Sequence, residues 1–124
     1  MKKIGLVLFI LVSLAMLIGC TENTRIEGNE ITAKEINGVQ VAELSWGKFN
    51  YDPGTIHVKA NQPVEIVADL NRLTGCYRSF VVPGLGISTT FSQRQNTYHF
   101  TPTQKGTYAF TCTMGMGSGN LVVE

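Results

Sequence analysis

Short runs of β-branched and aromatic residues, separated by turn-forming residues, fill residues 38–124 of this chain. Within these runs apolar and polar positions alternate. Val64, Ile66 and Ala68, for example, stand at every second position. A period of two is typical of strands that bury one face, and no helix of ordinary length is indicated anywhere in the segment. The pattern therefore predicts an all-β domain.

The spacing of the apolar runs also predicts the architecture of that domain. Turn residues follow one another closely, as in Asp52-Pro53-Gly54 and Asn61-Gln62. The expected strands cover residues 39–44, 55–59, 64–68, 80–82, 97–101, 106–112 and 121–123. Seven or eight strands in about 85 residues suit two packed sheets joined by Greek-key connections. We therefore expect a β-sandwich.

The first 37 residues have a different composition. Lys2 and Lys3 precede an uninterrupted apolar run from Ile4 to Ile18, which is the layout of an export signal. The run ends in Leu17-Ile18-Gly19-Cys20, which resembles the lipobox of secreted lipoproteins. About fifteen apolar residues fall short of the roughly twenty that span a bilayer, so an uncleaved single-pass helix is the weaker alternative.

Three segments follow from this interpretation. Residues 1–19 are expected to be a lipoprotein signal peptide, and residues 20–37 a lipidated Cys20 with a polar tether. Residues 38–124 are the domain. The tether is predicted from its scattered apolar residues, which bury too little surface to offset the entropy of ordering. The domain is then expected at the extracytoplasmic face of the cell membrane, held by its lipid anchor.

Charge excludes one large class of partners. The chain carries 10 Lys and Arg against 9 Asp and Glu, a formal net charge of +1. Removal of residues 1–19 takes two lysines with it and leaves 8 against 9, or −1. No basic stripe interleaved with aromatic residues is present, so nucleic acid is not an expected partner. No nucleophile with a base, carboxylate pair or phosphate-binding loop emerges either, and we do not expect an enzyme.

Sulfur is concentrated in two short segments of the expected domain. Two of the four methionines fall in the signal, and one of the three cysteines is the expected lipid anchor. The remaining sulfur-bearing side chains are Cys76, Cys112, Met114 and Met116. They belong to the segments Gly75-Cys76-Tyr77 and Cys112-Thr113-Met114-Gly115-Met116-Gly117. If two sheets bring these segments together, all four sulfurs meet.

The second segment places three sulfurs two residues apart. In an extended chain, residues at this spacing project to the same side, so Cys112, Met114 and Met116 converge. Gly115 and Gly117 remove bulk between them and allow the backbone to curl or to adopt positive φ. Such a loop is able to close around a small ion.

The ligand types indicate which ion. Thiolates and thioethers select Cu(I) over Mg, Ca or Mn, and over Cu(II), which prefers nitrogen and oxygen. Zinc is a distant third choice, because structural zinc sites use Cys and His and almost never Met. Two cysteines in an exported domain also commonly form a structural disulfide, and methionine also serves as core filler. The residues alone leave both alternatives open.

Beyond the ligand chemistry, the sequence resembles the cupredoxins, in particular cell-surface Cu(I)-binding proteins and cupredoxin modules fused to copper exporters. The resemblance covers most of the domain: residues 53–67, 75–76, 80–83, 85–87, 100–102 and 106–116. It implies a Greek-key β-sandwich with copper at one end, as one or two Cu(I) ions. The ligands it implies are Cys76, Cys112, Met114 and Met116.

Departures from ordinary blue-copper proteins favour transfer of the ion over electron transfer. Blue-copper sites use two His, one Cys and a weak axial Met. Here Cys76 stands where the first His is expected, and no His follows Cys112. The resemblance thus implies a copper chaperone in copper homeostasis or resistance, which exchanges its ion with a copper-transporting membrane protein or a cuproenzyme. An electron-transfer cupredoxin and a disulfide-bonded structural sandwich are the alternatives.

Other candidate side chains are expected to play smaller parts. His57 and His99 fall within predicted strands and are expected at the surface or at a sheet edge, not on the metal. Trp46 is expected in the core or at its rim. Tyr77 and Arg78 follow Cys76 directly and are candidates for shielding the site or contacting a partner.

Overall fold

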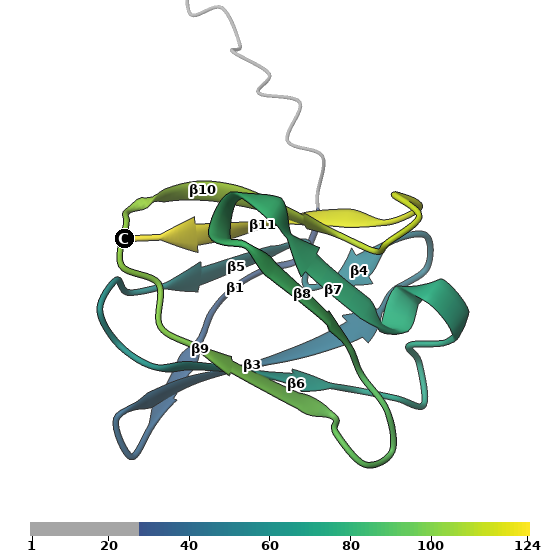
Figure 1. Ribbon diagram of the computed structural model, residues 1–124, viewed down its shortest axis with the longest axis horizontal. Helices are drawn as coiled ribbons and strands as arrows, with labels where there is room; N and C mark the ends of the chain where they lie inside the picture. Colours follow the sequence, from purple (N-terminus) through teal and green to yellow (C-terminus); the bar gives the residue numbers. More distant parts are fainter. Residues whose placement is uncertain (1–27) are drawn as a thin grey trace, which may run out of the picture.

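The computed structural model describes residues 28–124, which form a sandwich of two β-sheets (Figure 1). The expected signal peptide, Cys20 and the first part of the tether lie outside the described residues. Among residues 28–124, no helical segment has both the length and the apolar character of a membrane span. The only helical turns there are two 3-10 segments, η1 (Gly75–Arg78) and η2 (Pro83–Leu85).

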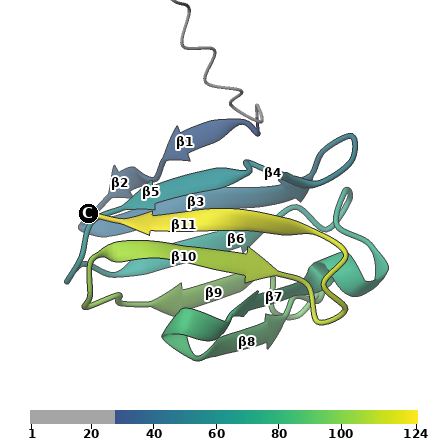
Figure 2. The ribbon, with the colours of Figure 1, turned by 90° about the horizontal axis from the view of Figure 1, so that it is seen from above.

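The larger sheet has six strands in the order β1-β5-β11-β10-β7-β8. Its strands are β1 (Glu30–Thr32), β5 (Thr55–Val58), β7 (Ser79–Val82), β8 (Ile87–Thr90), β10 (Gly106–Thr111) and β11 (Ser118–Val123). β5 pairs in parallel with both β1 and β11, whereas the other pairs are antiparallel. Figure 2 shows this sheet face on, with β11 and β10 across its middle.

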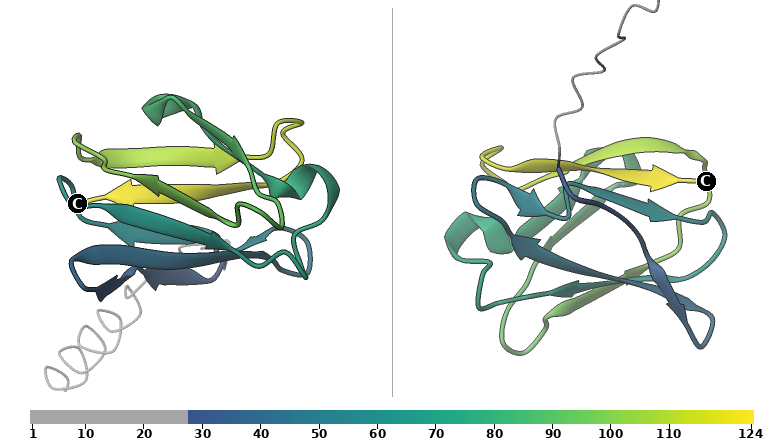
Figure 3. Two further views of the ribbon diagram at one scale, coloured as in Figure 1. Left: turned by 60° about the horizontal axis from the view of Figure 1, so that its bottom comes forward. Right: turned by 180° about the vertical axis from the view of Figure 1, so that it is seen from behind.

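The second sheet has five strands, with β2-β3-β6-β9 in sequence across it and β4 paired to the end of β3. Its strands are β2 (Lys34–Ile36), β3 (Val39–Trp46), β4 (Tyr51–Asp52), β6 (Val64–Ala68) and β9 (Thr97–Phe100). The chain passes repeatedly from one sheet to the other, as from β5 to β6 and from β6 to β7 (Figure 3). These crossings bring loops distant in sequence to the same end of the sandwich.

The core lies between the sheets and follows from the alternation in the sequence. In β6 the residues alternate strictly between buried and half-buried, and Val64 and Ile66 are fully buried. Phe80 and Phe110 pack with ring centroids 5.3 Å apart and fill the space between the layers. The prediction of an all-β sandwich is confirmed, with strands in all the expected places.

The number of strands and the length of the tether were predicted wrongly. Eleven strands are present in the described residues, not seven or eight, because β1, β2, β4 and β8 were not expected. Two of these, β1 and β2, lie within residues 20–37, the predicted polar tether. Ala33 between them is buried, and β2 joins β3 through Asn37-Gly38, where both residues have positive φ. An Asn-Gly pair is a strong signal for a two-residue hairpin turn, and this signal was available in the sequence.

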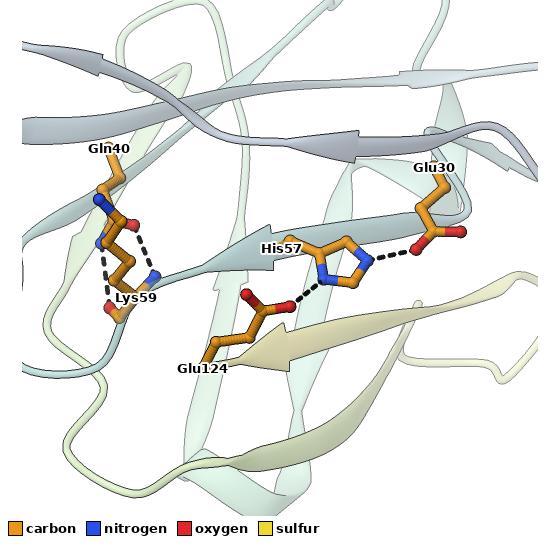
Figure 4. A network of polar contacts seen from close by, with 5 residues as sticks. All are labelled: Glu30, Gln40, His57, Lys59 and Glu124. Atoms are coloured by element: carbon orange, nitrogen blue, oxygen red, sulfur yellow. Dashed lines mark hydrogen bonds and ion pairs between the residues drawn. The ribbon is translucent and has the colours of Figure 1, made fainter.

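A histidine links the edge strand β1 to the end of β11 (Figure 4). His57 in β5 points its two ring nitrogens at two carboxylates: Nε2 meets Glu30, and Nδ1 lies 2.7 Å from Glu124. Nearby, the side-chain amide of Gln40 joins the second sheet to the backbone of Lys59, at 2.6 Å to its N–H and 3.0 Å to its carbonyl. As expected, His57 is taken up by contacts at the surface of the sheet.

Stability is expected to depend on pH through His57. Hydrogen bonds to Glu30 and then to Glu124 raise the pKa of His57 above its usual 6.5, against a smaller opposing effect of burial. Because the raised pKa belongs to the folded state, the contribution of His57 to the free energy of unfolding is complete below about pH 6.5. It fades as pH rises through the raised pKa. The free energy of unfolding of His57→Gln should therefore approach that of the wild type at about pH 9, after a deficit of at most about 1 kcal/mol at about pH 6.

Urea unfolding at the two pH values measures this difference. His99→Gln is the matched control, because His99 is an exposed ring 3.6 Å from Glu65 and joins no second carboxylate in the described structure. If His57→Gln loses the same free energy of unfolding at both pH values, the pH-dependent contribution of His57 is contradicted.

Candidate metal centre

Cys76 and Cys112 meet at one end of the sandwich. Their Sγ atoms lie 3.8 Å apart although the residues are 36 positions apart in sequence. Both are free thiols; Cys112 is buried and Cys76 is half-buried. The structure thus brings together the two predicted thiol ligands, which come from separate segments of the chain.

The order of the strands explains this meeting. Cys112 follows directly after β10, and β10 pairs with β7 through Thr111 and Val81. The 3-10 turn η1, which carries Cys76, leads directly into β7. Adjacent strands in a sheet lie about 5 Å apart, so the residue that precedes one strand and the residue that follows its antiparallel neighbour are brought to the same edge.

The methionines lie on the loop that begins at Cys112. Contrary to the expected extended chain, residues 113–117 form a turn, in which Gly115 has a φ of +68° and donates its N–H to the carbonyl of Cys112 at 3.0 Å. The Met116 N–H lies 3.3 Å from the Cys112 Sγ. The loop therefore curls around the thiol, as its glycines allow.

Both methionine side chains are exposed to solvent. Met114 is 71% exposed and Met116 is 61% exposed. Neither fills the core, so the alternative that they are core filler is not supported. Their backbone follows the Cys112 thiol, since the Met116 N–H lies 3.3 Å from the Cys112 Sγ, and their side chains are open to an incoming ligand.

The two thiols have unlike environments. Burial disfavours ionisation of Cys112 and acts to raise its pKa. Hydrogen bonds nevertheless hold the pKa of Cys112 below its usual value, and they come from the N–H groups of Met116 and Met114, the Cys76 thiol and the Gly117 N–H. Burial, and then the neighbouring Cys112, raise the pKa of Cys76. Cys112 is thus the thiol that is readier to act as a thiolate, which is the form that binds metals.

Two aromatic side chains, Trp46 and Tyr51, hold the loops of the site together, and the contact of Tyr51 was not predicted. The ring of Trp46 stacks on Tyr77, next to Cys76, with centroids 3.6 Å apart. A Cβ added at Gly117 would lie 2.7 Å from the same Trp46 ring, so only glycine fits there. Tyr51 donates its hydroxyl towards the carbonyls of Tyr77 at 3.1 Å and Ser79 at 2.9 Å. Trp46 lies at the rim of the core, as expected.

Removing the Tyr51 hydroxyl should loosen the segment that carries Cys76. Tyr51→Phe leaves the two carbonyls without this donor, and burial of the hydroxyl makes the loss larger than at a surface tyrosine. We expect the free energy of unfolding to fall by about 1–2 kcal/mol, as measured by urea denaturation.

The matched control for this prediction is Tyr108→Phe. Its hydroxyl bonds only the Gln104 carbonyl, at 2.9 Å in an exposed position, so its loss should cost less than about 0.5 kcal/mol. Equal losses in the two variants would mean that Tyr51 does not hold η1 in place.

The other possible ligands are arranged elsewhere. His57 is engaged by two glutamates, and His99 lies beside Glu65. Among residues 28–124, no group of three or more His, Cys, Asp or Glu side chains is placed to hold an ion. The loop that begins at Cys112 carries the two remaining soft side chains, the thioethers of Met114 and Met116.

The sequence matches a known protein family over most of its length. A family model described as the cupredoxin-like domain matches residues 7–123. The chain belongs to this cupredoxin-like family. No curated protein matches it.

Solved structures place this cupredoxin-like chain near two copper proteins. The metal-binding domain of the Cu(I)-exporting P-type ATPase CopA from Streptococcus pneumoniae, solved with Cu(I), is 26% identical. The match covers 78% of this chain and 97% of that domain, with a TM-score of 0.68. A copper-binding protein solved in its apo form is 28% identical over 78% of this chain and 99% of its own, with a TM-score of 0.65.

A more distant match shares the fold alone. A variant of amicyanin, in its Cu(I) form, is 22% identical over 73% of this chain and 87% of its own length, with a TM-score of 0.52. The cupredoxin-like sandwich is therefore common to all three matches.

Proposed function

We propose that this chain binds Cu(I) outside the cytoplasm through Cys76, Cys112, Met114 and Met116, and passes the ion to another protein. The observation that carries the proposal is the pair of free thiols 3.8 Å apart, beside a loop with two exposed thioethers. Four soft donors without a histidine favour Cu(I) over Cu(II) and zinc. The similar CopA domain was solved with Cu(I), and the second neighbour is a copper-binding protein, which supports copper as the ion.

The differing exposure of the sulfurs suggests the order of exchange. The thioethers of Met114 and Met116 are the most exposed, and neutral flexible thioethers bind weakly and adapt readily. They are released first, and a ligand of the partner takes their place. Cys76 is half-buried and Cys112 is buried with its N–H partners, so Cys112 is released last. At no point is the ion free in solution.

We propose that Cys20 is lipidated after cleavage of the signal, so that the carrier is held at the outer face of the membrane. The partner is a copper-transporting membrane protein or a cuproenzyme, and the site holds one or two ions. The chain acts as a carrier in copper homeostasis and catalyses no reaction.

Anaerobic titration tests the binding step. The full chain with Cys20→Ser, purified in detergent, is titrated with Cu(I) in competition with a Cu(I) chelator and examined by absorption spectroscopy after addition of Cu(II). We expect a colourless, tight Cu(I) complex. An intense blue Cu(II) complex would favour electron transfer instead, and two blocked thiols that bind no copper would favour a structural sandwich.

The thioethers have a separate test in the double variant Met114→Leu and Met116→Leu. Leucine keeps the size and apolar character of both side chains but removes the sulfur. Because a lost weak ligand costs less than a lost thiolate, we expect Cu(I) affinity to fall by about 10–100-fold. The free energy of unfolding should change by less than about 0.5 kcal/mol, since both side chains are exposed. An unchanged affinity would remove the methionines from the site.

A further inference from the structure

Four loops form the end of the sandwich that carries the sulfurs, and we call them together the site end. They are residues 47–50, 69–78, 91–96 and 112–117. Hydrogen bonds tie them together: Asn50 to the Ser118 N–H, the Phe91 N–H to the Arg78 carbonyl, and the Ala68 N–H to the Asn96 carbonyl. In Figures 1 and 2 these loops lie at the end opposite the C-terminus.

The site end exposes most of the large apolar side chains that the described residues leave in solvent. Phe49 is 83% exposed, and it stands next to Asn50, which is bonded to the end of the methionine loop. With Met114 and Met116 it makes three of the four exposed large hydrophobic side chains, the fourth being Ile36 in β2. Exposed apolar side chains that gather at one place mark a contact surface.

The exposed charged side chains of the four loops are all cationic. Lys48, Arg72 and Arg94 are exposed, and the Lys48 amino group lies 5.7 Å from the Phe49 ring centroid. Asp69, the acidic residue in the four loops, is half-buried and accepts the Asn71 N–H at 3.0 Å. A surface that combines exposed apolar side chains with cations is complementary to a surface that carries carboxylates.

We propose that the site end docks onto an acidic protein surface that surrounds the copper ligands of a partner, and that Lys48, Arg72 and Arg94 steer this encounter. The inference rests on the proposed function. It names the chemistry of the partner's surface, namely Asp and Glu around Cys or Met. A protein fits better than a lipid surface, because three cations and one aromatic ring give weak membrane attachment, and transfer needs the thioethers to meet other ligands.

The point at which the chain enters the domain agrees with this choice. Asn29 bonds the Asp52 carboxylate at 3.2 Å and accepts the Gly54 N–H at 2.8 Å. Gly28 lines one pocket with Asn50 and Ser118, so the N-terminal segment joins the domain beside the site end. Seven residues separate Cys20 from Gly28, a reach of at most about 30 Å. A lipid anchor on Cys20 would hold the site end close to partners in the same membrane.

Copper transfer to two matched peptides tests the proposal. The peptides carry the same Cys and Met ligands, one flanked by four aspartates and the other by four lysines, and their Cu(I) affinities are measured beforehand. With the Cu(I)-loaded Cys20→Ser chain in neutral detergent, we expect transfer to the aspartate peptide to be about 10-fold faster at low salt. The ratio should approach one at about 1 M salt, where the Debye length falls to about 3 Å.

Charge reversal supplies the matched variants. The site-end variant carries Lys48→Glu, Arg72→Glu and Arg94→Glu. It should reverse the preference between the peptides. The same change of charge at Lys34, Lys59 and Lys105, away from the site end, should leave the preference in place. Equal rates to both peptides, or equal effects of the two triple variants, would overturn the docking surface while leaving Cu(I) binding intact.

The titration with Cu(I) separates the two proposals. A chain that holds no Cu(I) in the titration overturns the proposed function and the docking surface together.

A membrane experiment tests whether the cations face lipid instead of a protein. The lipid-anchored chain is reconstituted in phosphatidylglycerol or phosphatidylcholine vesicles, and the rates of transfer to the aspartate peptide are compared between the two lipids. If phosphatidylglycerol slows the wild type but not the site-end variant, the cations face lipid, and the protein-docking proposal is wrong.

Discussion

Replacing Cys112 by serine is expected to lower the affinity for Cu(I) by more than about 100-fold. Loss of a partner that only orients a metal ligand typically costs 10–100-fold, and loss of the ligand itself costs more. Cys112 is the buried thiol whose pKa lies below its usual value, held by the N–H groups of the loop. Anaerobic competition with a Cu(I) chelator measures the change.

The control for this prediction is Cys20→Ser. Cys20 is the expected lipid anchor, so its replacement should leave the Cu(I) affinity of the domain within about 2-fold of the wild type. Circular dichroism of Cys112→Ser establishes that the sandwich has folded. Near-normal Cu(I) affinity in a folded Cys112→Ser chain would exclude this thiol as a ligand.

Replacing Phe110 by alanine is expected to have the largest effect on stability. Phe110 is fully buried, and its ring packs 5.3 Å from Phe80 and 5.5 Å from Tyr51, centroid to centroid. Its removal leaves a cavity between the sheets, so we expect a loss of about 3–5 kcal/mol in the free energy of unfolding. Such a loss is a large fraction of the roughly 5–15 kcal/mol that a domain commonly has.

Phe49→Ala is the matched control, because Phe49 is 83% exposed. Its removal should change the free energy of unfolding by less than about 0.5 kcal/mol. Urea denaturation of both variants makes the comparison. A loss below about 1 kcal/mol at Phe110 would mean that the two sheets do not share the core described here.

The fold was largely predictable from local pattern. The alternation in residues 64–68 corresponds to β6, and the apolar run at residues 80–82 lies in β7. The tether was the main error, because residues 30–36 are mostly exposed even within their strands, so composition alone resembles that of an unfolded segment. Only the pairing of β1 with β5 and of β2 with β3 gives them a structure.

The metal centre was predictable in its donors but less so in its geometry. Soft donors of few kinds in two segments could be identified from sequence, and the thiols of Cys76 and Cys112 do meet. The curl of the methionine loop depends on hydrogen bonds to Cys112, and spacing alone suggested an extended chain. The contact of Tyr51 with the segment of Cys76 joins residues 26 positions apart, and no local pattern reports such a pair.

X-ray absorption at the copper edge tests the central claim most directly, because it identifies the atoms bound to the ion. The sample is the full chain with Cys20→Ser, loaded anaerobically with one equivalent of Cu(I). The account predicts a first shell of sulfur alone, with fewer sulfur atoms in the double variant Met114→Leu and Met116→Leu. A shell that contains nitrogen or oxygen, or one that the leucines leave unchanged, would contradict it.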